Sequence, residues 1–248
     1  MKLKDLLTLI SNVAKKENLS TPFIVGGIPR DKLANRLNSI SDIDFTTGNA
    51  DVHYLAKEIA FELKELKPNY QVMNDGHARI ILGDLKLDFS SNFIIPNAVK
   101  TLNSLGRSNL SNMELEIYSR DFTCNTLLLS LDLKDIKDLT QRGISDINKK
   151  LLRTCLPPEL TLGLDHKRVV RVIYLAAKLG FTVDEYILNW IKLNPSTFSN
   201  VPIDYLSKKL LKSFSYNEQI TSNLLSELNL WPYVPATDPL TPFIKKNI

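Results

Sequence analysis

Two carboxylates stand one residue apart in the segment Asp42-Ile-Asp44. On a strand, alternate side chains leave the same face, so these acids would lie close together. They would repel each other unless a divalent cation shared them, and oxygen ligands of this kind suit Mg²⁺. Asp88, on a neighbouring expected strand, could complete the cluster. The alternative is a pair of solvated acids at a strand end, and the Asp-x-Asp spacing alone favours that alternative.

Two glycines, Gly26 and Gly27, precede the acids between an expected strand and an expected helix. Without side chains they let backbone N–H groups approach a polyphosphate, and the helix N-terminus favours negative charge. Arg30 could bind a phosphate through two parallel hydrogen bonds, while Asp31 could belong to the same site or cap the helix. Followed by Asp-x-Asp, this order predicts a site where a nucleoside triphosphate meets a metal.

Asp165 and Arg168 are three residues apart on an expected helix, so an acceptor would lie beside donors. Cytosine and adenine each present an amino donor beside a bare ring nitrogen. Uracil and guanine instead present a carbonyl beside a ring N–H. The pair would therefore accept C and A and reject U and G. The alternative is an ordinary exposed ion pair within a helix, worth about 0.2–0.5 kcal/mol.

These segments resemble, in order and spacing, the motifs of the class II tRNA nucleotidyltransferase (CCA-adding enzyme) and bacterial poly(A) polymerase family, among the DNA polymerase β-like nucleotidyltransferases. The similar segments are Gly26-Gly27-Ile-Pro-Arg30-Asp31, Asp42-Ile-Asp44, Arg120-Asp121-Phe-Thr-Cys-Asn125, Gly143-Ile-Ser-Asp146 and Asp165-His-Lys-Arg168-Val-Val-Arg171. Their agreement in order is more specific than any one of them alone.

The resemblance implies template-independent addition of C, A or both to the 3′ end of tRNA or another RNA, from CTP and ATP, with release of pyrophosphate. It implies a two-metal Mg²⁺ mechanism with Asp42 and Asp44 as metal ligands, and Asp88 joins them as the third expected catalytic carboxylate. The expected nucleotide-binding residues are Gly26, Gly27, Arg30, Asp31, Arg120, Asp121, Asn125, Asp165, Arg168 and Arg171. Among these, Asp165 and Arg168 correspond to the family's amino-acid template for the incoming base.

Three positions depart from the family pattern. Ser119 stands where a first arginine is usual, Leu164 replaces the template glutamate, and Tyr174 replaces a further arginine after Arg171. The change at Leu164 would loosen the orientation of the template pair. The change at Tyr174 would remove a phosphate or nucleotide contact. We therefore expect these departures to affect the switch from C to A more than nucleotidyl transfer itself.

The apolar spacing predicts the elements that must position these residues. Helices are expected over residues 3–14, 30–37 and 52–66, and strands over 22–25, 43–46, 71–73, 78–82 and 86–89. Residues 90–119 are expected to form a mobile loop, and the spacing beyond Asp121 indicates helices almost to the end. The fold class is therefore α+β. A nucleotidyltransferase head (1–150), with a small mixed or antiparallel sheet flanked by helices, precedes an all-helical neck and short body (151–248).

Composition limits the alternatives. The chain has 248 residues, a net charge of +4 and two cysteines, Cys124 and Cys155, without metal-ligand spacing. No signal peptide or membrane-spanning run is expected, so we expect a cytoplasmic protein with no membrane partner. The mild charge does not identify a nucleic-acid partner. Lysines and arginines at 149–153, 167–178 and 208–212 could line an RNA track or simply form solvated helix faces.

Three other functions remain open at this point. A poly(A) polymerase shares the same motifs, and a nucleotidyltransferase could also modify a protein or small molecule. A catalytically inactive RNA-binding homologue is disfavoured because it would have no reason to keep two repelling acids together. Few residues follow Gly180 compared with the family's long body and tail, which suggests a short member. A homo-oligomer or a partner subunit could then supply part of the RNA grip.

Overall fold

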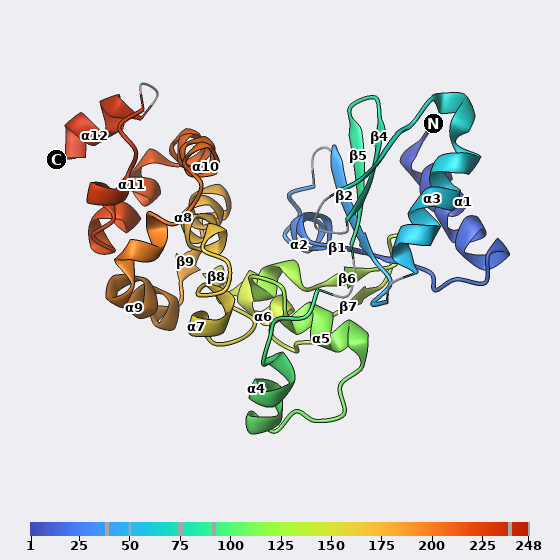
Figure 1. Ribbon diagram of the computed structural model, residues 1–248, viewed down its shortest axis with the longest axis horizontal. Helices are drawn as coiled ribbons and strands as arrows, with labels where there is room; N and C mark the ends of the chain where they lie inside the picture. The colour runs from blue at the N-terminus through green and yellow to red at the C-terminus, as the bar shows by residue number, and fades with distance from the viewer. Residues whose placement is uncertain (38–39, 50, 74–76, 91–92, 238–239, 248) are drawn as a thin grey trace. The chain divides into compact units, whose positions relative to one another are not determined.

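A computed structural model describes residues 1–37, 40–49, 51–73, 77–90, 93–237 and 240–247, and the chain forms two compact units (Figure 1). The first unit comprises Met1–Arg120 and Cys124–Ile144, and the second comprises Asp121–Thr123 and Ser145–Ile248. Residues 121–123 join the second unit through backbone contacts. Phe122 forms an isolated bridge with Thr154, and the Thr123 N–H donates to the Arg153 carbonyl at 2.9 Å.

A mixed sheet is the framework of the first unit. Its described strands follow the order β3-β4-β5-β2-β1-β6-β7, in which β2 and β5 run parallel and the other neighbours are antiparallel. The strands are β1 (Phe23–Val25), β2 (Asp42–Thr46), β3 (Asn69–Val72), β4 (Ala78–Leu82), β5 (Leu85–Phe89), β6 (Leu128–Leu129) and β7 (Ile136–Lys137). The α+β class and the mixed sheet predicted from the sequence are confirmed.

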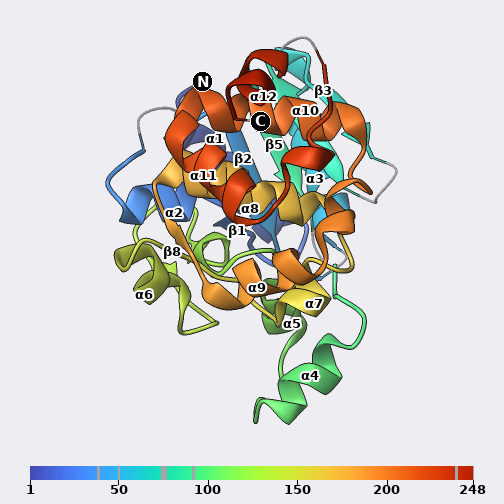
Figure 2. The ribbon, with the colours of Figure 1, turned by 90° about the vertical axis from the view of Figure 1, so that its left-hand side faces the viewer.

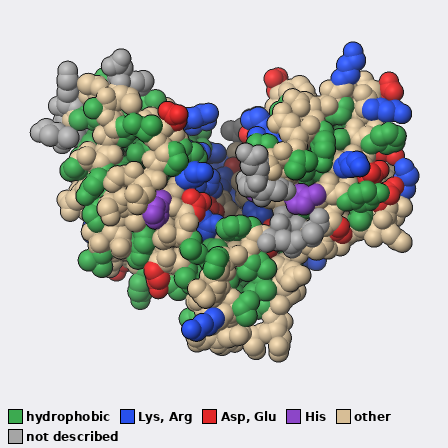
Figure 3. All heavy atoms as spheres, in the orientation of Figure 1, with side chains coloured by type: hydrophobic (Ala, Val, Ile, Leu, Met, Phe, Trp, Pro, Cys, Tyr) green, Lys and Arg blue, Asp and Glu red, His purple; other side chains and the backbone are tan. Residues whose placement is uncertain are grey.

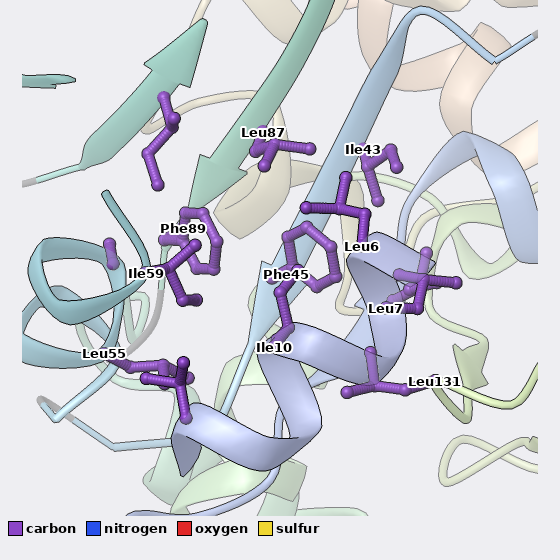
Figure 4. Packing of buried hydrophobic residues seen from close by; sticks show 14 of the residues in the cluster. Leu6, Leu7, Ile10, Ile43, Phe45, Leu55, Ile59, Leu87, Phe89 and Leu131 are labelled. Atoms are coloured by element: carbon purple, nitrogen blue, oxygen red, sulfur yellow. The ribbon is translucent and has the colours of Figure 1, made fainter. Parts of the chain in front are cut away.

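The core of this unit explains why the acids reach the surface. Residues Leu6, Leu7 and Ile10 of helix α1 (Leu3–Lys16) pack against the sheet, where the rings of Phe45 and Phe89 stack with centroids 4.8 Å apart (Figure 4). Because alternate residues of a strand leave opposite faces, burying one set turns the next set away from the core. The intervening acids of β2 and β5 therefore leave the opposite face of the sheet.

Helices flank this sheet. They are α1 (Leu3–Lys16), α2 (Gly27–Leu33), α3 (Val52–Glu62), α4 (Ala98–Ser104) and α5 (Asn112–Tyr118), with a 3₁₀ turn at Lys64–Leu66. The expected helix at 30–37 is displaced, since α2 begins at Gly27 and ends before Asn35, whose φ of +53° is left-handed. The helix expected over 52–66 ends at Glu62 and continues as the 3₁₀ turn.

Two predictions about regular structure were wrong. The segment 90–119 was expected to be a loop, yet its described residues contain α4 and α5. Ser111 caps α5 in a capping box with Glu114, and each residue's side chain bonds the other's backbone N–H. The segment after Asp121 was expected to be helical, yet it contains a 3₁₀ turn at Thr123–Asn125 and the strands β6 and β7. A short apolar run fits a buried central strand as well as a helix, and β6 is such a strand.

The second unit is mostly helical. Its helices are α7 (Pro158–Thr161), α8 (Lys167–Leu179), α9 (Glu185–Leu193), α10 (Ile203–Tyr216), α11 (Glu218–Glu227) and α12 (Thr241–Asn247); α6 (Gly143–Asn148) spans the junction of the units, and 3₁₀ turns lie at Pro195–Phe198 and Trp231–Tyr233. A short parallel pair, β8 (Leu151–Leu152) and β9 (Thr182–Val183), precedes and follows α8. Helices α8, α10 and α11 pack together (Figure 2). None of the described helices has the length and hydropathy needed to cross a bilayer.

Candidate functional site

The two acids of β2 share the sheet face opposite the core. Asp42 is exposed, with its carboxylate 3.4 Å from the Lys86 ammonium, and Asp44 is half-buried. Asp44 packs against the turn between β1 and α2, where a Cβ on Gly26 would lie 2.5 Å from its Oδ2. The φ of Gly26 is +76°, which side-chain-bearing residues rarely adopt. The residue therefore has to be glycine for both reasons.

Asp88 lies beside Asp44 but is already paired. The parallel register of β2 and β5 sets the two residues opposite each other. Arg79 of β4 donates from Nε to Asp88 Oδ1 at 2.6 Å and from Nη2 to Oδ2 at 3.1 Å. The hydrogen bonding to Asp88 and the negative charges of Asp88, Asp42 and Asp44 raise the pKa of Arg79. Among the described residues, no group of three or more His, Cys, Asp or Glu side chains is arranged to hold a metal.

Arg30 is buried and held by two partners. Its Nε and Nη2 donate to the two carboxylate oxygens of Asp31 at 2.7 and 2.9 Å, and its Nη1 donates to Asn125 Oδ1 at 2.6 Å. Gly27, the first residue of α2, lies directly beside this guanidinium. A Cβ built on Gly27 would lie 3.3 Å from Arg30 Nη2. The interpretation of Asp31 as a helix cap was wrong, since α2 has no side-chain cap and Asp31 pairs with Arg30.

Arg120 is anchored to the acid-bearing strand through a residue that the sequence analysis missed. Glu116 is buried, and its Oε2 accepts from the Thr46 hydroxyl at 2.8 Å. Its Oε1 accepts from Arg120 Nη2 at 3.2 Å. Thr46 ends the same strand as Asp44, so one carboxylate connects β2 to this guanidinium. The i, i+4 spacing of Glu116 and Arg120 was the available signal.

Asp121 belongs to the second unit, where it is an ion-pair partner of α8. Its Oδ2 accepts from Arg171 Nε at 2.7 Å, and its Oδ1 accepts from the Phe122 N–H at 2.9 Å. The negative charge of Asp121 raises the pKa of Arg171, with a further contribution from Tyr205. Burial raises the pKa of Tyr205, so its hydroxyl stays protonated beside the guanidinium. The structure thus brings two predicted nucleotide-binding residues into direct contact.

The pair Asp165 and Arg168 is close, but only one member is on the helix. Helix α8 begins at Lys167, so Asp165 lies in the preceding turn, contrary to the expectation of a shared helix. Its carboxylate is 3.8 Å from Arg168 Nε and accepts from the Lys167 N–H at 3.1 Å. Arg168 is buried, and its Nη1 donates to the Thr161 carbonyl at 3.4 Å. A half-exposed acceptor therefore stands beside a fixed donor.

The two departures near this pair have different surroundings. Leu164 is an exposed apolar side chain next to Asp165. Tyr174, one turn beyond Arg171, meets Tyr216 edge to face at 5.8 Å and carries the Lys209 ammonium 4.3 Å from its ring centroid. A lysine from another helix therefore supplies positive charge at this position.

Comparison with known proteins yields one family and a set of relatives. Residues 22–153 match the family model described as "Poly A polymerase head domain". The tRNA nucleotidyltransferase cca2 of Schizosaccharomyces pombe is 27% identical over 172 residues, which cover 67% of this chain and 35% of that protein. The CC-adding tRNA nucleotidyltransferase of Halalkalibacterium halodurans is 30% identical over 125 residues, covering 50% of this chain and 32% of that protein.

A solved structure shares the fold. The CCA-adding enzyme of Bacillus stearothermophilus, in complex with CTP, superposes with a TM-score of 0.72 at 19% identity over 96% of this chain and 55% of that one. The chain thus spans about a third of these two curated relatives and about half of the structural one.

Proposed function

The chain belongs to the family of the poly(A) polymerase head domain, and on that premise we propose that it is an RNA nucleotidyltransferase that adds C, A or both to the 3′ end of tRNA. The observation that carries the proposal is the packing of the Asp44 carboxylate on Gly26, at the turn that leads into the helix of Arg30. This places an acidic strand end directly beside a turn that a triphosphate can approach. The tRNA substrates named for the relatives support the choice of acceptor.

Asp42 and Asp44 are the residues that would hold Mg²⁺. Both carboxylates leave the same face of β2, and oxygen donors on a partly exposed strand end fit a hard cation that keeps several of its waters. The ion would supply charge stabilisation for the attacking and leaving oxygens of the transfer. Asp88 is ion-paired with Arg79, so its role is to set the charge beside Asp44 rather than to hold the ion.

The residues of the first unit would then bind and orient the triphosphate. The Gly26-Gly27 turn offers backbone N–H groups, and the Arg30 guanidinium is fixed by Asp31 and Asn125. The Arg120 guanidinium is held in place by its hydrogen bond to the Glu116 carboxylate. In the reaction, the RNA 3′-hydroxyl forms a bond to the α-phosphorus, the bond to the β-phosphate oxygen breaks, and pyrophosphate leaves. Fixed donors lower the entropic cost of holding that geometry.

Base choice would rest on Asp165 and Arg168. The half-exposed carboxylate accepts from an exocyclic amino group, and the guanidinium donates to the bare ring nitrogen beside it. Arg171, held by Asp121, adds a fixed positive charge one turn along the helix. Cytosine and adenine form hydrogen bonds with both groups. Uracil and guanine instead set a carbonyl oxygen against the carboxylate acceptor and a ring N–H against the guanidinium donor.

A second candidate function is polyadenylation, because the matching family model is that of a poly(A) polymerase head and Leu164 departs from the template pattern. The deciding experiment incubates the chain with Mg²⁺, tRNA lacking its 3′ end, and each triphosphate singly and in mixtures. The product ends are then sequenced. Completed CCA, CC or terminal A ends support the proposal, and a long A tail supports the second candidate.

Asp44→Asn serves as the catalytic control in that assay, and Asp84→Asn is matched to it because Asp84 is an exposed acid of the same unit. Asp44→Asn is expected to abolish transfer while Asp84→Asn preserves it. Transfer that survives Asp44→Asn, or no transfer by the unaltered chain with any triphosphate, contradicts the proposal.

A further inference from the structure

Three tyrosines and three lysines of the second unit alternate along α8 and α10 and contact one another across the two helices. We call this set the tyrosine–lysine band, and its members are Lys167, Tyr174 and Lys178 on α8 and Tyr205, Lys209 and Tyr216 on α10. On each helix, consecutive members are four or seven residues apart, so they share one face. Figure 3 shows Lys and Arg side chains gathered in this unit.

Lys209 lies at the centre of the band. Its ammonium is 4.3 Å from the Tyr174 ring centroid and 5.6 Å from that of Tyr205. At the two ends, Lys167 lies 5.7 Å from the Tyr205 ring and Lys178 lies 5.9 Å from the Tyr216 ring. Each ammonium is thus held near an aromatic face, which fixes charge and ring together.

The band carries positive charge that carboxylates do not balance. In the described part of the chain, none of its three lysines forms an ion pair with an acid. The nearby Asp121 carboxylate is engaged by Arg171. Burial, followed by the charges of Arg171, Lys212, Lys178 and Lys208, lowers the pKa of Lys209 to about 8. An anion on this surface would relieve a repulsion already present in the folded chain.

We propose that the tyrosine–lysine band binds a single-stranded segment of RNA, with phosphates at its lysines and a base stacked on Tyr216. Tyr216 is 49% exposed, so part of its ring is open to a ligand. The α8 residues 167–178 span about 17 Å, roughly the length of five stacked nucleotides, which suits a strand better than a single phosphate. Alternating cations and aromatic rings are the features that bind single strands without reading their sequence. The inference rests on the proposed function in taking the strand to be part of the acceptor RNA.

The test measures binding without chemistry. Fluorescence anisotropy of a labelled single-stranded oligoadenylate and oligocytidylate is recorded with the full chain, without triphosphate or Mg²⁺. Lys209→Met keeps the aliphatic length and loses the charge, and Tyr216→Ala loses the ring. Each is expected to weaken binding about tenfold, the scale of one stacked base or one fixed phosphate contact.

Matched controls separate the band from general charge. Lys208→Met removes the same charge from the neighbouring exposed residue of α10, and Tyr186→Ala removes a ring that is 77% exposed on α9. Both controls are expected to change affinity by less than about threefold. If Lys208→Met weakens binding as much as Lys209→Met, the band is not the site. If inorganic triphosphate competes as well as RNA at equal phosphate concentration, the site binds a polyphosphate rather than a strand.

Two further readouts keep the inference separate from folding and from the proposed function. Lys209→Arg retains the charge and is expected to retain affinity. A variant that lowers the melting temperature but binds RNA normally would assign the band a packing role and overturn the inference. If the chain transfers no nucleotide but the RNA affinities of the two band variants and the two controls differ as predicted, the proposed function is wrong and the RNA-binding role of the band is supported. If transfer occurs but the variants bind alike, the band fails and the proposed function stands.

Discussion

Gly26 allows a direct test of the contact between the turn and the acidic strand. We expect Gly26→Ala to lower kcat for nucleotide addition by at least about 100-fold, because a Cβ 2.5 Å from Asp44 Oδ2 must displace the carboxylate by a large fraction of an ångström. Initial rates at saturating triphosphate measure the effect. The substitution also places alanine at a φ of +76°, so lost stability has to be distinguished from lost geometry.

Gly83 provides that distinction, because its φ is also positive, at +58°, and nothing lies within 4 Å of a Cβ built on it. Gly83→Ala is expected to cost about 1 kcal/mol of unfolding free energy from the backbone alone and to keep kcat near normal. Equal losses of kcat in the two variants would show that backbone strain, rather than the position of Asp44, accounts for the result.

Asp165 is the residue on which base choice is predicted to depend. Asp165→Ala removes the acceptor but leaves Arg168 held by the Thr161 carbonyl. We expect the preference for C and A over U and G to fall about tenfold or more, the value of one hydrogen bond to a charged group, while some transfer remains. Competition between paired triphosphates on one RNA measures the ratio, with the exposed Asp204→Ala as control. An unchanged ratio would remove the template interpretation.

The site residues show how far single positions can be predicted from the sequence. The shared face of Asp42 and Asp44 follows from strand alternation, and the structure agrees. Arg79 and Glu116 were missed because their partners, Asp88 and Thr46, come next to them only in the folded unit. The turn at Gly83 pairs Leu82 with Leu85 and so sets Arg79 opposite Asp88. That register was visible in the sequence once the hairpin was assumed.

The capping box of α5 tests an element that the sequence analysis treated as loop. Ser111→Ala removes the acceptor for the Glu114 N–H, and we expect it to lower the free energy of unfolding by about 1 kcal/mol. Chemical denaturation measures the difference, with Ser108→Ala as a control on an exposed serine nearby. If both variants are as stable as the unaltered chain, the box contributes nothing measurable to α5.

At the level of elements, strands β1 to β5 of the first unit were predicted to within a few residues, because their short apolar runs are bounded by Gly, Pro, Asn, Asp or Ser. The two errors have different causes. The run at 127–131 has no period that separates a buried strand from a helix, so only its neighbours β1 and β7 decide its state. The segment 90–119 is rich in Asn and Ser, and its helix α5 begins at a capping box rather than at an apolar repeat.

At the scale of the molecule, net charge and local charge lead to different expectations. A net charge of +4 is small for a protein that binds a polyanion. In the second unit, however, Arg171, Lys178, Lys208 and Lys212 all act on Lys209. RNA affinity should therefore depend on the lysines of the tyrosine–lysine band, Lys209 above all, rather than on total charge. Lys209→Met should then reduce the dependence of log affinity on log salt by about one unit or less, whereas Lys4→Met, in the first unit, should leave it unchanged.

We expect the lowered pKa of Lys209 to make RNA binding by the tyrosine–lysine band sensitive to pH. In the free chain Lys209 is half-protonated at its pKa of about 8, and a bound phosphate raises that pKa toward the normal lysine value. Below pH 7 the lysine is charged in both states, so affinity is at its maximum. Above pH 8 binding must take up a proton, and affinity is expected to fall by up to about tenfold between pH 7 and pH 9. The titratable and charged groups around Lys209 are Arg171, Tyr174 and Lys178 of α8 and Tyr205, Lys208 and Lys212 of α10. Because burial raises the pKa of Tyr205, its hydroxyl does not titrate in this range.

Anisotropy titrations at constant ionic strength measure the profile, and Lys209→Arg should flatten it. A fall of the same size in Lys209→Arg would assign the pH dependence to another group.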